Sequence, residues 1–159
     1  MKLTWSPSST VPSKAIAILL VVSALFGCGD NQDEPGAVEL LQRIREEGYR
    51  SWQRAPGWES RRPTSAPHGE AVDVYVNDIV VEVLDGSDGA MSWPTGSIIA
   101  KDGWDGSDLE IIAVMEKRDD GWFWAEYDGG GEVCFSGRPG VCLDCHGSGS
   151  DYVRAFTLP

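Results

Sequence analysis

The sequence predicts an α+β domain that is mainly an antiparallel β-sheet, preceded by one helix. Apolar and polar residues alternate over residues 72–77, as they do in a strand with one buried face. Further runs rich in β-branched and aromatic residues follow at regular spacing, with Gly- and Asp-containing turns between them. Apolar residues at helical spacing precede these runs. Together the patterns predict one helix and then a sheet of about five strands.

The predicted helix covers residues 33–46. Its apolar residues recur at the spacing of one helix face, and Gly48 supplies a stop signal just beyond them. A polar, proline-rich connection follows at residues 56–67. The residues expected to face the core are Ala37, Leu40, Leu41 and Ile44.

The predicted strands occupy the middle of the chain. The alternating segment gives a strand at residues 72–76, and the β-branched run at residues 79–84 gives another. The remaining strands are predicted at residues 97–101, 109–117, 122–127 and 132–135. Turns are expected between them at residues 85–89, 103–106, 119–121 and 129–131.

A short motif close to the C-terminus carries the chemistry. Residues 142–146 read C-x-x-C-H, the attachment signature of c-type haem. Two thiols at this spacing can form thioethers with the two vinyl groups of one porphyrin edge, and the next imidazole can ligate the iron. We therefore expect one haem c per chain, attached through Cys142 and Cys145, with His146 as axial ligand. A structural zinc is the alternative, although zinc sites usually separate their ligand pairs by a longer loop; its ligands would be Cys134, Cys142, Cys145 and His146.

The first 27 residues predict a bacterial lipoprotein signal peptide. Residues 15–26 are apolar apart from Ser23, and this run suits a signal peptide and is shorter than the roughly 20 residues that span a bilayer. The run ends in Leu25-Phe26-Gly27-Cys28, which resembles the lipobox, so we expect Cys28 to be lipidated. Phe26 is bulkier than that motif usually accepts, and an uncleaved anchor or an ordinary signal peptide cut nearby are the alternatives. Residues 28–35 would then be an acidic tether and residues 36–159 the folded domain, on the periplasmic side of the membrane or in the cell envelope.

Charge and cysteine use narrow the class of protein further. Cleavage before Cys28 leaves 132 residues with 11 basic and 25 acidic side chains, a net charge of −14. That length supports one domain, and the charge disfavours binding to nucleic acid or to anionic headgroups. Membrane contact is therefore expected only through the lipid. With the other three cysteines assigned, Cys134 is expected to be a buried free thiol or, second, part of an intermolecular disulfide.

Four segments occur in a specific order: Tyr49-Arg50-Ser51-Trp52, then His68-Gly69 with Val74-Tyr75-Val76-Asn77, then Pro94-Thr95-Gly96-Ser97-Ile98-Ile99-Ala100-Lys101, and then Met115-Glu116-Lys117 with Trp122-Phe123-Trp124, followed by residues 142–146 and Asp151. Together they make the chain similar to the cytochrome P-460 family, whose relatives include the β-sheet cytochromes c′. The resemblance implies an antiparallel sheet, a homodimer and one haem per subunit with five-coordinate iron. It also implies oxidation of hydroxylamine or binding of nitric oxide, with electrons passed to a separate soluble acceptor.

The resemblance implies a special role for Lys101. In P-460 enzymes a lysine side chain is bonded to the porphyrin rim, and by position that lysine corresponds to Lys101. Strand alternation places Lys101 on the same face as Ser97 and Ile99, so this face could line the haem pocket. Burial against the porphyrin would lower the pKa of Lys101 and help it to react as an amine. A solvated lysine at a strand end is the alternative.

The sixth coordination position decides between reaction and electron transfer. Met115 is expected in the core, and the family pattern does not make His68 a ligand, so we expect an open distal site for small nitrogen species. P-460 enzymes resemble one another in placing a carboxylate above the iron, and Ala113 is nearest that position here. We therefore expect an apolar distal pocket that transfers protons poorly. The candidate axial partners are His68, Met91, Met115 and Lys101, and the nearby carboxylates of opposite strand parity are Glu110 and Glu116.

The sequence leaves three functions open. The first is a P-460-type haem oxidoreductase acting on hydroxylamine or nitric oxide. The second is a non-enzymatic protein that binds nitric oxide, as a cytochrome c′ does, and the third is an electron carrier with Met115 or Met91 as sixth ligand. Two groups of side chains are expected to be structural: Trp122 with Trp124 in packing, and Asp102, Asp105 and Asp108 in solvated turns.

Overall fold

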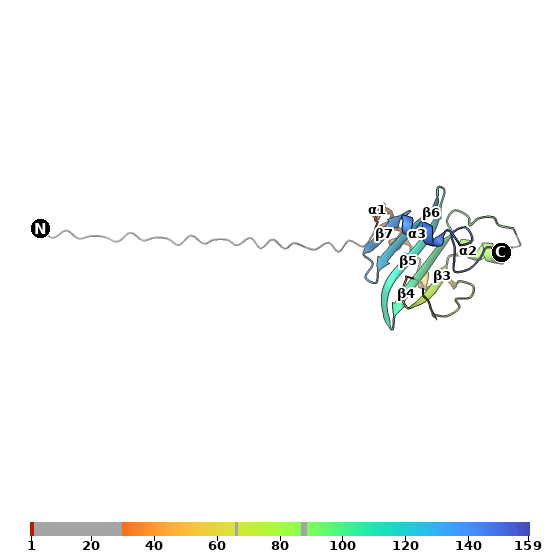
Figure 1. Cartoon of the computed structure of the whole chain (residues 1–159), viewed down its shortest axis with the longest axis horizontal. Coiled ribbons are helices and arrows are strands. Elements are labelled where there is room, and N and C mark those ends of the chain that lie inside the picture. Colours follow the sequence, from red (N-terminus) through yellow and green to blue (C-terminus); the bar gives the residue numbers. More distant parts are fainter. Residues whose placement is uncertain (2–29, 66, 87–88) are drawn as a thin grey trace.

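The computed structural model describes Met1 and residues 30–65, 67–86 and 89–159, and the predicted signal peptide and Cys28 lie outside these residues. The described chain forms a seven-stranded antiparallel sheet with three α-helices (Figure 1), which confirms the α+β class. The strand order is β1-β3-β4-β5-β6-β7, and β2 also pairs with β3. The helices are α1 (Glu34–Glu46), α2 (Asp78–Asp85) and α3 (Gly140–His146), with a 3₁₀ turn η1 (Tyr49–Ser51). The strands are β1 (Gln53–Arg54), β2 (Arg62–Pro63), β3 (Ala71–Val76), β4 (Ile98–Asp105), β5 (Asp108–Arg118), β6 (Gly121–Asp128) and β7 (Val133–Gly137).

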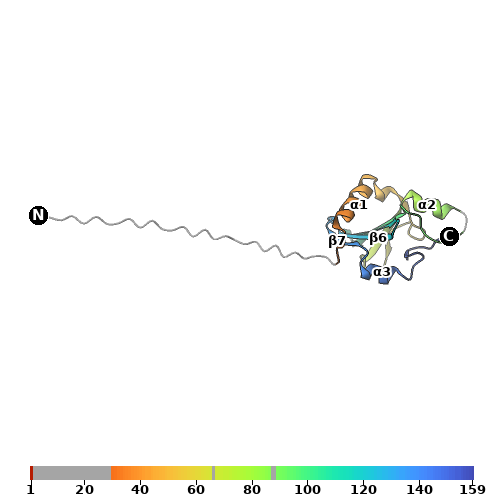
Figure 2. The same cartoon turned by 90° about the horizontal axis from the view of Figure 1, so that it is seen from above.

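The sheet separates two layers. Figure 2 shows α1 on one side of the sheet and α3 on the other. The α1 side holds a core cluster around Leu40, Ile112 and Tyr127, and the opposite side holds a second cluster around Val74, Trp122 and Trp124. Trp122 and Trp124 are therefore packing residues, as predicted. Within the described ranges, no helix has the length and apolar character needed to cross a membrane.

Helix α1 forms where the sequence predicts it. The side chain of Asp33 accepts a hydrogen bond from the Gly36 amide at 3.0 Å and caps the helix. On the sheet, Tyr127 donates its hydroxyl to the Ala37 carbonyl at 2.6 Å. The predicted core residues of the helix are all buried: Ala37, Leu40, Leu41 and Ile44.

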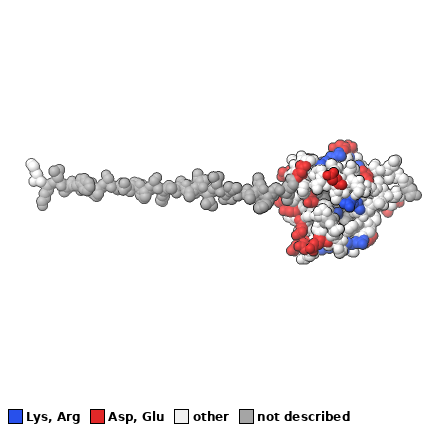
Figure 3. Space-filling model, viewed as in Figure 1, with Lys and Arg blue, Asp and Glu red and all other residues white. Residues whose placement is uncertain are grey.

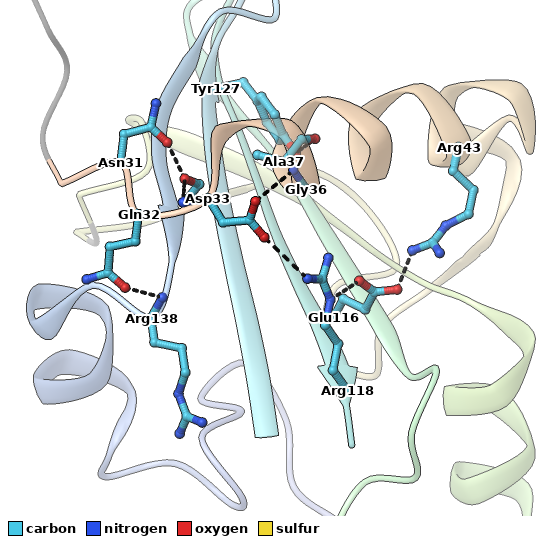
Figure 4. A network of polar contacts seen from close by, with 11 residues as sticks. Asn31, Gln32, Asp33, Gly36, Ala37, Arg43, Glu116, Arg118, Tyr127 and Arg138 are labelled. Atoms are coloured by element: carbon cyan, nitrogen blue, oxygen red, sulfur yellow. Dashed lines mark hydrogen bonds and ion pairs between the residues drawn. The ribbon is translucent and has the colours of Figure 1, made fainter. Parts of the chain in front are cut away.

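The residues just before α1 are attached to β7 (Figure 4). The Gln32 amide donates to the Ser136 carbonyl at 3.0 Å, and the Asp33 amide donates to the Ser136 hydroxyl at 2.8 Å. The Arg138 amide in turn donates to the Gln32 side chain at 3.0 Å. The described part of the predicted tether therefore has fixed contacts with the sheet from about Asn31 onward. Figure 3 shows that acidic side chains gather along one edge of the domain in that view.

The prediction of a strand at residues 79–84 is wrong, because these residues form α2. The Asn77 side chain accepts a hydrogen bond from the Val80 amide at 3.3 Å, and Asp78 places a carboxylate in the first helical turn. These are favourable interactions at a helix N-terminus. They outweigh the modest helix propensity of the β-branched residues. Asn77 also accepts from the Ile98 amide at 3.0 Å, so the same side chain fixes the start of β4.

One acidic side chain expected in a solvated turn is buried. Asp102 has no solvent-exposed surface, whereas Asp105 is exposed as expected. The Asp102 carboxylate accepts hydrogen bonds from the Tyr49 hydroxyl and from Nε of Arg50, both at 2.6 Å. Burial and this hydrogen bond raise the pKa of Tyr49, so its hydroxyl stays protonated as a donor. Strand β4 continues through Asp102 instead of ending at Lys101.

Replacing Asp102 by Ala leaves a buried hydroxyl and a guanidinium without their acceptor. We expect Asp102→Ala to lower the free energy of unfolding by about 2–3 kcal/mol. The matched control is Asp105→Ala on the same strand, which should change it by less than about 0.5 kcal/mol because the side chain is exposed. Urea unfolding followed by tryptophan fluorescence measures both values. Equal destabilisation by the two variants would contradict a structural role for Asp102.

Candidate functional site

A cavity of about 530 Å³ lies between the sheet and α3. Its volume falls within the range of roughly 300–1,000 Å³ that is typical of ligand and cofactor pockets. The loop before β3 and the segment after α3 complete its walls. Four residues predicted from the sequence line this cavity together: Lys101, Cys142, Cys145 and His146.

The register of the sheet explains which side chains face the cavity. Lys101 on β4 lies directly opposite Ala113 on β5, Ala113 opposite Glu126 on β6, and Glu126 opposite Phe135 on β7. Residues opposite one another on paired antiparallel strands project to the same face, and all four line the cavity. A second row lies two residues away along the strands and also lines it: Ile99, Met115 and Trp124. The expectation that Ile99 and Lys101 share a face of the pocket is confirmed.

Helix α3 presents the two cysteines and the histidine together. Residues three and four apart on a helix are neighbours on its surface, so Cys142, Cys145 and His146 share one side of this short helix. Both cysteines are free thiols of intermediate exposure. Burial raises the pKa of the Cys142 thiol to about 11. The guanidinium of Arg154 lies 3.0 Å from the Cys145 sulfur.

The imidazole of His146 is oriented by a backbone carbonyl. Its Nδ1 lies 2.9 Å from the carbonyl oxygen of Tyr152. Because a carbonyl only accepts, Nδ1 carries the proton and Nε2 keeps its lone pair. Burial lowers the pKa of His146, and the hydrogen bond to Tyr152 opposes this shift only in part. A neutral imidazole with a free Nε2 is the form that binds a metal. In metal-bound histidines the other ring nitrogen usually donates a hydrogen bond to a carbonyl or carboxylate, as Nδ1 of His146 does here.

Asp151 fixes the segment that carries this carbonyl. Its carboxylate accepts hydrogen bonds from Lys117 Nζ at 2.9 and 3.0 Å and from the Trp93 amide at 2.9 Å. Its own carbonyl accepts from the Trp122 indole at 2.8 Å. Asp151 and Tyr152 have φ angles of 44° and 65°, a left-handed conformation that non-glycine residues seldom adopt. Asp151 is a positioning residue that the sequence marked only by its place in the family pattern.

Lys101 lies in the middle of β4, and its alternative as a solvated strand-end lysine does not apply. Burial lowers the pKa of its amine. Among the described residues, no hydrogen bond or ion pair engages this amine. A partly buried amine without a partner is a group that bound cofactor or substrate can use.

A histidine–carboxylate pair on the cavity wall was not predicted. His68 Nδ1 lies 2.9 Å from Glu126 Oε2, and both residues line the cavity. The cavity lining is therefore less apolar than expected, because it includes His68 and Glu126 beside the expected Lys101. One feature of the sequence indicates that Glu126 faces the cavity. It lies two residues after Trp124 in an otherwise apolar and aromatic strand, so both side chains project to the same face of the sheet. Glu110 is exposed, and Glu116 pairs with Arg43 of α1, so both carboxylates face away from the cavity as expected.

The remaining candidate ligands, two methionines and one cysteine, differ in exposure and in bonding. Met91 is 95 % exposed and Met115 is 8 % exposed in the core cluster on the cavity side of the sheet. Cys134 is disulfide-bonded, so the expectation of a free thiol is wrong. It therefore cannot supply a thiolate to zinc. Within the described residues, no three His, Cys, Asp or Glu side chains are grouped to hold a metal ion.

One buried donor at the site has no partner. The indole nitrogen of Trp124 is buried, and no hydrogen-bond acceptor reaches it among the described residues. Its ring meets the His146 ring edge-on, with centroids 6.3 Å apart. A polar group bound in the cavity would be able to accept this hydrogen bond.

The chain was compared with protein-family models, with curated proteins and with solved structures. None of the three comparisons finds a match.

Proposed function

We propose that this chain is an exported c-type mono-haem protein of the cytochrome P-460 type, which oxidises hydroxylamine or binds nitric oxide. One observation carries the proposal: Lys101 on β4 and the C-x-x-C-H residues on α3 line the same cavity of about 530 Å³. These groups are about 40 residues apart in the sequence. Their convergence fits a flat cofactor held between a sheet and a helix.

The residues of the cavity divide into three roles. Cys142 and Cys145 would form the thioethers, and His146 would ligate the iron through Nε2 while the Tyr152 carbonyl holds its ring. Lys101, with its lowered pKa, would bond to the porphyrin rim. The amine nitrogen and the ring carbon would each lose a hydrogen in this step, and a peroxide would accept the two electrons and be reduced to water. When bound, the haem iron supplies the redox chemistry and the coordination of a small nitrogen ligand.

The sheet face supports proton handling next to that ligand. Glu126 accepts a hydrogen bond from His68 Nδ1 at 2.9 Å, and the Glu126 carboxylate can take up or release a proton within the cavity. Ile99, Met115 and Phe135 supply an apolar surface beside it that excludes water. This combination favours an oxidoreductase over a simple trap for nitric oxide. Oxidation would send electrons to a separate soluble acceptor, because the chain has one haem motif.

Peptide mass mapping of the purified protein tests the cofactor and its attachments. We expect the peptide with Cys142 and Cys145 to carry haem, and the peptide with Lys101 to remain bound to the same haem. The peptide with Lys117 serves as internal control, because its amine is paired with Asp151 and should stay unmodified. Lys101→Arg should keep the thioethers and lose the crosslink. A colourless protein of unmodified mass would contradict the proposed function, and a free Lys101 peptide would contradict the crosslink.

Substitution of Glu126 tests proton handling. We expect hydroxylamine oxidation with an artificial electron acceptor to fall about 100-fold in Glu126→Gln, because one general base is lost. Binding of nitric oxide should persist in this variant. Glu132→Gln, at an exposed position, is the control. A wild-type protein that binds nitric oxide and never turns over hydroxylamine would indicate the nitric oxide-binding protein instead.

The proposed lipid anchor at Cys28 is tested by Cys28→Ser. The variant should leave the membrane fraction and appear in the soluble periplasmic fraction, because the acyl chains provide the anchoring. Continued membrane association would indicate another anchor. Because Cys134 is disulfide-bonded while Cys142 and Cys145 are free thiols, a lipidated Cys28 requires Cys134 to pair with a cysteine of another chain. A disulfide between Cys28 and Cys134 in the mature protein would contradict lipidation, because one sulfur cannot form both bonds.

A further inference from the structure

We propose that His68 is a second axial ligand of the haem iron, which a small nitrogen ligand must displace in order to bind. The inference rests on the proposed haem and adds a control on access to it. It replaces the expectation of a permanently open distal position with a position occupied by this chain's own imidazole.

The distance between the two histidines supports shared ligation. The ring centroids of His68 and His146 are 6.4 Å apart, and the ring planes differ by 62°. A metal–imidazole bond is about 2 Å long and the ring centre lies about 1 Å beyond the nitrogen, so two imidazoles on one metal ion have centres about 6 Å apart. The observed separation of the two rings therefore matches that of two imidazoles bound to one metal ion.

The hydrogen bonds leave the correct nitrogen free on both rings. Nδ1 of His146 donates to the Tyr152 carbonyl, and Nδ1 of His68 donates to the Glu126 carboxylate, each at 2.9 Å. In the neutral form of each ring, Nε2 therefore keeps a lone pair. A carboxylate or carbonyl on the far nitrogen is the usual support of a metal-bound histidine. His68 and His146 thus have the same type of support from opposite walls of the cavity.

The backbone holds His68 close to the sheet. A Cβ added to Gly103 on β4 would lie 1.8 Å from the His68 carbonyl oxygen, so only glycine permits this approach. Gly69 has φ +108°, and a Cβ there would lie 2.8 Å from the Trp104 amide nitrogen. The Glu70 amide donates to the Trp104 carbonyl at 3.0 Å. Two glycines and this hydrogen bond therefore fix the loop on β4 and direct His68 over the cavity.

The other candidate ligands are less suited. Met91 is exposed, and Met115 is packed in the core cluster beside Trp124. Lys101 lies on the cavity wall, but its amine is assigned to the porphyrin rim. His68 is the one candidate that combines a free metal-binding nitrogen with a supporting acceptor.

The test uses optical and electron paramagnetic resonance spectra of the purified haem-bearing protein. We expect the wild type to be six-coordinate and low-spin with the signature of two imidazole ligands. His68→Ala should be five-coordinate and high-spin, should bind nitric oxide at least 10-fold faster, and should return to low-spin when imidazole is added. His68→Met should stay six-coordinate and gain the absorption of a methionine–iron bond. Ser65→Ala, a substitution at another lining position of the same loop, is the control and should retain the wild-type spectra.

Each other result contradicts the inference. A wild type that is haem-bearing and high-spin would exclude His68 as ligand and leave the proposed haem function intact. A low-spin spectrum that persists in His68→Ala would assign the sixth position to another residue. If His68→Ala fails to accumulate, the wild-type resonance spectrum alone decides, because a bis-imidazole signal requires both histidines of the chain. A colourless protein would instead refute the haem itself.

Discussion

The cavity depends on the attachment of the C-terminal segment to the sheet through Asp151. The Lys117–Asp151 ion pair is 2.9 Å long and joins β5 to the residues just after α3. The Trp93 amide and the Trp122 indole bond to the same residue. This cluster allows Asp151 and Tyr152 to keep left-handed backbone conformations, which cost free energy outside glycine. This backbone conformation places the Tyr152 carbonyl next to Nδ1 of His146, where it orients the ring.

One face of the sheet packs against α1 in the core, and the other face lines the cavity. The α1 face is closed by apolar packing and by ion pairs between a buried carboxylate and a partly exposed guanidinium, such as Asp102 with Arg50. The opposite face is left incomplete at its centre, and there the side chains of Lys101 and Glu126 point toward α3. A strand that contributes to both faces must alternate between them. On β4, Lys101 and Asp102 are adjacent in sequence and serve the cavity and the α1 core respectively.

Much of this arrangement could be predicted from local patterns. The spacing in α1, the alternation in β3 and the parity of Ile99 and Lys101 each depend on one period and were confirmed. The α2 segment was missed because the capping of Asn77 on Val80 outweighed the β propensity of the residues that follow. The burial of Asp102 and the pairing of His68 with Glu126 depend on contacts across 52 and 58 positions of the chain. No periodicity in the sequence encodes such contacts, so the structure was needed to find them.

Helix α3 has a consequence for how this domain matures. It is seven residues long and has no buried residue, although it carries both predicted thioether cysteines and the predicted histidine ligand. A helix this short has little intrinsic stability and depends on tertiary packing. If a large planar group fills the space beneath it, that group becomes the surface on which α3 rests. Covalent attachment of the group would then complete the folding of α3 and also prepare the site for function. In a chain that never receives the group, α3 would remain poorly packed.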